Sequence, residues 1–130
     1  MISEGAAIKE FIDNYTSKGM YTITGWSALI EFEKGSAVIL DVSSENMRES
    51  GYIVDSIHIP FPQILSRINE LPPDEIIVVY CEDNTRAAFA TTVLQLQGFK
   101  AYVLEDGIDG WIAAGGDTTL QEQEPPPRSG

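Results

Sequence analysis

The chain has 130 residues, of which 43% are hydrophobic and 22% charged, a composition typical of one soluble domain with a full hydrophobic core. Twenty acidic residues against eight basic ones give a net charge of −12, which excludes nucleic acids and anionic membranes as partners by long-range repulsion. The same charge would suit a basic protein partner.

A helix is predicted within residues 1–20, because apolar residues recur at helical spacing from Ala7 to Tyr15. The folded domain is predicted over residues 21–115, and residues 116–130 are predicted to form a polar, disordered tail. Within the domain, strands are expected at 21–24, 37–42, 56–60, 76–80 and 100–104. Helices are expected at 25–34, 44–51, 61–72, 85–97 and 108–114. This alternation predicts an α/β fold with a mostly parallel central sheet of about five strands and helices on both faces.

The only cysteine, Cys81, follows the buried strand that ends at Tyr80 and precedes a helix. Ligands of parallel sheets bind at this position, beyond the carboxyl ends of the strands. Backbone N–H groups of the following loop can surround the sulfur and stabilise a thiolate, and Arg86 adds a positive charge. The predicted site is therefore a catalytic Cys81 with an anion-binding loop that comprises Glu82, Asp83, Asn84, Thr85 and Arg86.

A lone cysteine with a single histidine, His58, argues against a disulfide framework and a zinc site, and no cofactor is predicted. The free thiol and the absence of a secretory or membrane-spanning pattern indicate a cytoplasmic protein.

Four segments together resemble the rhodanese family over residues 21–115: A-V-I-L-D-V, G-Y-I-V-D-S-I-H-I-P, I-I-V-V-Y-C-E-D-N-T-R and L-Q-G-F-K-A-Y-V-L-E-D-G-I-D-G-W-I-A-A-G. The resemblance implies a sulfurtransferase in which Cys81 takes a sulfane sulfur from a small donor such as thiosulfate. Cys81 would carry this sulfur as a persulfide to a thiol or protein acceptor. It also implies that Asp41 is structural, that Trp111 packs in the core and that His58 has no catalytic role.

The sequence departs from the family pattern at four positions. Ser43 stands where an arginine is common, and Tyr52 stands where a histidine is common. Asn84 replaces the usual glycine of the loop, and Ala87 replaces the usual serine after the loop arginine. Two acids also follow the cysteine, and we expect both to point into water because the loop amides face the sulfur. The acidic rim favours a neutral, cationic or protein-borne donor or acceptor.

Two other functions remain open from the sequence. A rhodanese-fold module could bind or regulate a partner without catalysis. A phosphatase or arsenate reductase is disfavoured, because these enzymes place five residues between cysteine and arginine, whereas four lie between Cys81 and Arg86 here.

Overall fold

A computed structural model describes residues 21–119 together with Ala6, Lys9 and Glu10. Most of the predicted N-terminal helix and residues 120–130 of the predicted tail lie outside the described residues. The chain forms one five-stranded parallel sheet in the order β1-β5-β4-β2-β3, which confirms the predicted α/β fold. The strands are β1 (Thr22–Ile23), β2 (Ala37–Asp41), β3 (Ile57–His58), β4 (Ile76–Tyr80) and β5 (Lys100–Leu104).

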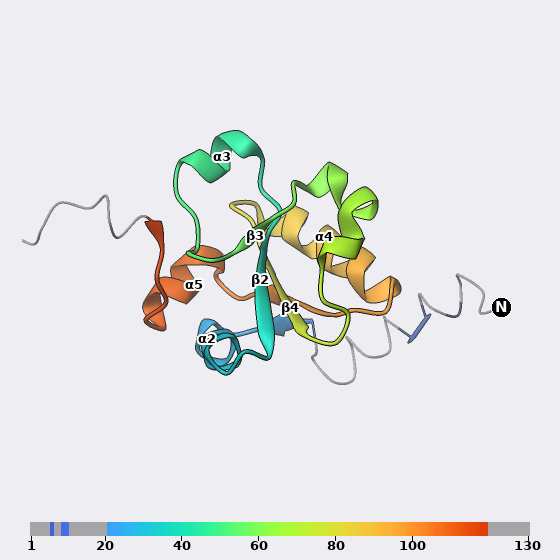
Figure 1. Cartoon of the computed structure of the whole chain (residues 1–130), viewed down its shortest axis with the longest axis horizontal. Helices are drawn as coiled ribbons and strands as arrows, with labels where there is room; N and C mark the ends of the chain where they lie inside the picture. Colours follow the sequence, from blue (N-terminus) through green and yellow to red (C-terminus); the bar gives the residue numbers. More distant parts are fainter. Residues whose placement is uncertain (1–5, 7–8, 11–20, 120–130) are drawn as a thin grey trace, which may run out of the picture.

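Helices cover both faces of this sheet (Figure 1). The helices α2 (Gly25–Glu33) and α5 (Gly107–Ala113) pack on one face, and α4 (Asn84–Leu96) packs on the other. Successive side chains of β4 point to opposite faces of the sheet. Ile77 and Val79 pack on the α4 side, whereas Val78 and Tyr80 pack on the α2 side. Burial on both faces explains why β4 has an uninterrupted apolar sequence.

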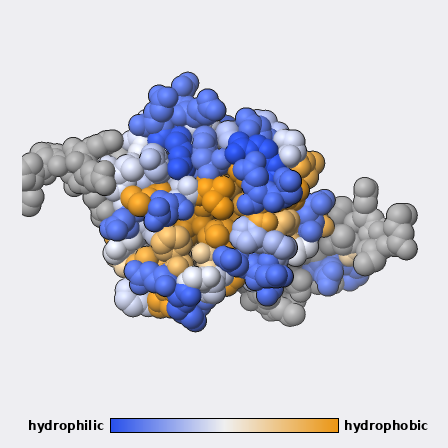
Figure 2. All heavy atoms as spheres, in the orientation of Figure 1, coloured by the Kyte–Doolittle hydropathy of each residue, from blue (hydrophilic) through white to orange (hydrophobic). Residues whose placement is uncertain are grey.

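The segment predicted as a helix over residues 61–72 is instead two short 3₁₀ stretches, η1 (Phe61–Gln63) and η2 (Leu65–Glu70). The regular geometry breaks at Arg67, whose φ is −120° and ψ is 17°. Its guanidinium donates to Glu70, Gln63 and the carbonyl of His58. Hydrophilic residues predominate over this segment and the short α3 (Glu45–Glu49), and apolar residues gather at the centre of the same view (Figure 2).

The first four residues of the predicted tail, 116–119, belong to the described structure, and some of them pack against the domain. Thr118 is buried and forms an antiparallel bridge with Ile53. The carbonyl of Asp117 accepts a hydrogen bond of 3.1 Å from the indole of the buried Trp111. Trp111 therefore packs in the core as expected. None of the described helices is long and apolar enough to cross a membrane.

The contact between α2 and α5 is tight enough to require glycine at its centre. A Cβ added to Gly25 would lie 2.1 Å from the carbonyl oxygen of Gly110, a backbone atom that cannot move aside on its own. We expect Gly25→Ala to lower the free energy of unfolding by about 2 kcal/mol, although alanine is the better helix former. Urea unfolding followed by circular dichroism measures this change. Ser27→Ala, at an exposed position in the same turn, should change stability by less than about 0.5 kcal/mol, and equal stability of the two variants would contradict the tight contact.

Candidate active site

The carboxyl ends of the strands meet at one edge of the sheet, and the polar residues of interest follow them there. Asp41 at the end of β2 is in register with Tyr80 at the end of β4 and with His58 on β3. Cys81 follows Tyr80 directly, and its side chain continues the alternation of β4 toward the α4 face. The strand register therefore brings the predicted nucleophile to the edge where ligands of parallel sheets bind.

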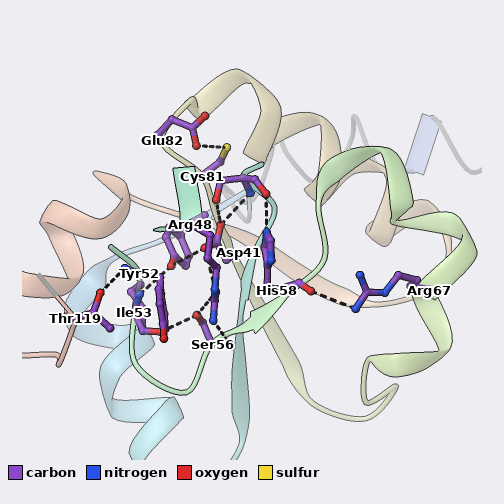
Figure 3. Close-up of polar contacts among 12 residues, drawn as sticks. Asp41, Arg48, Tyr52, Ile53, Ser56, His58, Arg67, Cys81, Glu82 and Thr119 are labelled. Carbon is purple, nitrogen blue, oxygen red and sulfur yellow. Dashed lines mark hydrogen bonds and ion pairs between the residues drawn. The ribbon is translucent and has the colours of Figure 1, made fainter. Parts of the chain in front are cut away.

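Glu82 is exposed, as expected, but one of its carboxylate oxygens also lies against the sulfur (Figure 3). The Cys81 thiol donates a hydrogen bond of 3.2 Å to Glu82 Oε1. The other carboxylate oxygen, Oε2, lies 3.5 Å from Nη1 of Arg86, one helical turn further along the chain. Both acids are exposed as expected, but the sequence did not predict that Glu82, four residues before Arg86, would bridge the guanidinium and the thiol.

The rest of the predicted loop is shorter than the sequence indicated. The helix α4 begins at Asn84, so only Glu82 and Asp83 separate it from Cys81. The Asp83 side chain caps the helix by accepting from the backbone N–H of Thr85 at 2.9 Å, and this acid is exposed. The backbone of Asp83 acts to lower the pKa of the Cys81 thiol. Asn84 and Thr85 belong to the first turn of the helix.

These surroundings keep the thiol protonated at neutral pH. Burial raises the pKa of Cys81, the hydrogen bond to Glu82 and its negative charge raise it further, and the Asp83 amide and Arg86 lower it. Together they raise the pKa to about 11. The sequence had predicted a stabilised thiolate. Burial of the thiol is the largest cause of its raised pKa, and the contact with Glu82 adds to it.

The sulfur nevertheless lies in the walls of two hollows. The larger, of about 430 Å³, is bounded by the first turns of α4 and α5. The smaller, of about 230 Å³, is bounded by the ends of β2 and β4 and by the loop after α3. Cys81, Glu82 and Ile108 line both. Arg86 lines a separate hollow of about 480 Å³ beside Phe61. Cys81 therefore borders two hollows although it is only 4% exposed, and Arg86 contacts Glu82 and lines the neighbouring hollow.

A buried polar network next to Cys81 holds the strand ends together (Figure 3). Asp41, which is 1% exposed, accepts hydrogen bonds from the backbone and side chain of Ser43, from the Tyr80 hydroxyl and from Arg48 Nη1. Burial and the charge of Asp41 raise the pKa of Tyr80, so its hydroxyl remains a donor. These contacts give Asp41 the structural role that the resemblance implied.

Arg48 accounts for two of the departures from the family pattern. Its guanidinium lies 3.1 Å from Asp41 Oδ2 and 3.8 Å from the centre of the Tyr52 ring. Arg48 on α3 thus supplies the cation near Asp41 where Ser43 replaces a common arginine, and Tyr52 forms a cation–π contact with it. Sequence reasoning did not select Arg48. The available signal was a single basic residue in a short helix that follows a strand ending in a buried acid.

His58 lies outside the two hollows around Cys81. Its Nε2 atom lies 2.7 Å from the carbonyl oxygen of Ser43. Among residues 21–119 and the three described N-terminal residues, no group of His, Cys, Asp and Glu is arranged to hold a metal ion.

Comparison with known proteins agrees with this architecture. Residues 27–114 match the sequence profile of the Rhodanese-like domain family. The chain is 31% identical over 86 residues to the thiosulfate sulfurtransferase GlpE of Pseudomonas savastanoi pv. phaseolicola, covering 65% of this chain and 81% of GlpE. It is 32% identical over 84 residues to YqhL of Bacillus subtilis, covering 62% of this chain and 67% of YqhL.

Among solved structures, a rhodanese-related protein from Thermoplasma volcanium superposes with a TM-score of 0.67 at 26% identity, covering 77% of this chain and 98% of that protein. The profile match spans more than half of the chain and includes Asp41, Cys81, Arg86 and Trp111. The chain therefore belongs to the rhodanese-like domain family.

Proposed function

We propose that this protein is a sulfurtransferase that carries a sulfane sulfur as a persulfide on Cys81. The observation that supports this most directly is the position of the thiol. It follows β4 at the carboxyl edge of the sheet, precedes the N-terminus of α4, and lines two hollows. Relatives that are named sulfurtransferases support the same reaction class.

The reaction needs no oxidant or reductant. The Cys81 thiolate attacks the outer sulfur of the donor, an S–S bond forms, and the bond between that sulfur and the donor breaks with its electron pair leaving on the donor. The leaving group is sulfite for thiosulfate and a thiolate for a persulfide donor. An acceptor nucleophile then attacks the outer sulfur, and Cys81 leaves as a thiolate. The Asp83 amide and the N-terminus of α4 would stabilise the charge on sulfur in both steps.

Sulfur loading tests this function directly. The wild-type chain, incubated with thiosulfate or a polysulfide, should gain the mass of one sulfur atom, and cyanide should remove it as thiocyanate. Cys81→Ser should gain none, because the chain has no other cysteine. Intact-mass spectrometry measures both. Circular dichroism should show that the variant is folded, so that loss of loading reports chemistry.

A non-catalytic binding or regulatory module is the second candidate, and the contact between Cys81 and Glu82 favours it. A protonated thiol beside a carboxylate is a poor nucleophile at neutral pH. In such a module the acidic loop would recognise a basic protein segment. A wild-type chain that takes up no sulfur from any sulfane donor between pH 7 and pH 10 would support this candidate and overturn the sulfurtransferase.

A further inference from the structure

The larger hollow in front of Cys81 is acidic. Three of the residues that line it are acids, namely Glu82, Asp106 and Asp109, and none of its lining residues is basic. A molecule that delivers sulfur to Cys81 through this hollow would meet carboxylates on its way. Clefts lined by one sign of charge concentrate ligands of the opposite sign and exclude those of the same sign.

Arg86 does not offset this charge for an incoming donor. Its guanidinium lies 3.5 Å from Glu82 Oε2, so its charge is already shared with that carboxylate. It also lines the separate hollow beside Phe61 and not the one that holds the thiol. The donor therefore meets the acids of the hollow without a basic side chain in its wall.

Glu82 is the acid closest to the chemistry. Its Oε1 atom is 3.2 Å from the sulfur, so any donor whose outer sulfur reaches Sγ must also come near this carboxylate. A positive group on the donor could pair with Glu82 in place of the thiol. That exchange would release Sγ from the hydrogen bond that keeps it protonated. A dianion such as thiosulfate would instead be repelled at the point of attack.

We propose that Glu82 selects sulfur donors by charge, favouring a persulfide whose carrier bears a positive charge and disfavouring thiosulfate. This inference rests on the sulfur-transfer function proposed above. In the favoured step the Cys81 thiolate attacks the outer sulfur of R–S–SH, the new S–S bond forms on Cys81, and the carrier leaves as R–S⁻. The positive group on R remains paired with Glu82 during the transfer.

Two persulfides of similar length and opposite charge test the selection, namely those of cysteamine and of 3-mercaptopropionate. At low ionic strength the wild-type chain should load sulfur from the cysteamine persulfide at least about tenfold faster. In about 1 M salt, where the Debye length is about 3 Å, the preference should largely disappear. Glu82→Gln should reduce the preference about fivefold and load faster from thiosulfate. Asp74→Asn, an exposed acid before β4 at the opposite edge of the sheet, removes the same charge and should leave the preference unchanged.

Alkylation measures the same selection without sulfur transfer. Relative to N-acetylcysteinamide, Cys81 should prefer neutral iodoacetamide over anionic iodoacetate by about fivefold, and Glu82→Gln should remove this preference. Equal reaction with both reagents, or equal loading from both persulfides, would overturn the charge selection and leave sulfur transfer standing. Charge-selective alkylation without loading from any donor would overturn sulfur transfer, and the inference with it.

Discussion

Alkylation of Cys81 by iodoacetamide should be about a thousandfold faster at pH 10 than at pH 7, because only the thiolate reacts. The pKa of this thiol is raised to about 11 by burial, the hydrogen bond to Glu82 and the charge of Glu82. Below that pH, each pH unit raises the thiolate fraction about tenfold. The rate should therefore rise steadily over this range without a plateau. Intact-mass spectrometry at timed quenches gives the rate at a single site, since the chain has one cysteine.

Two controls separate the causes of this pH dependence. In the same chain unfolded in urea, the rate should level off above about pH 9.5, as for an ordinary thiol of pKa about 8.5. Glu82→Gln loses both the negative charge and the strong acceptor but keeps the burial, so its rate should level off at a lower pH than that of the wild type. A folded wild-type chain whose rate is already flat from pH 7 would contradict the raised pKa of Cys81, and a Glu82→Gln rate profile equal to that of the wild type would contradict the contribution of Glu82.

The raised pKa bears on how sulfur transfer would start. At neutral pH nearly all of the thiol is protonated, so the nucleophile must form when a donor arrives. The Glu82 carboxylate is the group in contact with the thiol proton, and it is also the group that a positively charged donor would engage. Donor binding and thiol activation would then be coupled through one residue. This coupling distinguishes the proposed enzyme from a site whose thiolate is formed in advance by backbone amides.

The order of strands and helices could be predicted because the core strands are buried on both faces. β2 and β4 are uninterrupted apolar runs, and such runs suit a central parallel strand. The segment at residues 61–72 has apolar residues at helical spacing, and this spacing does not distinguish an α-helix from short 3₁₀ stretches. The break lies at Arg67, which contacts Glu70 within the segment and the carbonyl of His58 outside it, and the contact with His58 leaves no periodic signal.

The sequence predicted where Cys81 lies in the fold, but it did not predict which way the neighbouring Glu82 side chain points. Cys81 follows an apolar strand, so its place at the sheet edge follows from the fold. The direction of Glu82 depends on where the next helix begins, because that start decides which residue caps it and which lies one turn before Arg86. Helix starts shift by a residue between prediction and structure, here from Thr85 to Asn84. The spacing of Glu82 and Arg86 could be read from the sequence, but the contact of Glu82 with the sulfur could not.

Removal of the Asp41 carboxylate should destabilise the fold more than any other single substitution considered above. We expect Asp41→Ala to lower the free energy of unfolding by about 3–5 kcal/mol, as when one partner of a buried ion pair is lost. The substitution leaves the Tyr80 hydroxyl and the Ser43 side chain without their acceptor and Arg48 without its counter-charge. Urea unfolding measures the change. Asp74→Ala makes the same chemical change at an exposed turn and should alter stability by less than about 0.5 kcal/mol.

A double-mutant cycle shows whether the ion pair itself carries this effect. Arg48→Ala alone should also destabilise, because Arg48 donates to Ser56 and lies over Tyr52 besides pairing with Asp41. In the variant that carries both substitutions, the loss should be at least about 1 kcal/mol smaller than the sum of the single losses, since neither charge is then left unpaired. Additive losses would mean that the two residues act independently. Because Asp41, Ser43 and Tyr80 also line the smaller hollow beside Cys81, a coupled loss would show that the wall of the site is held by the same ion pair that stabilises the fold.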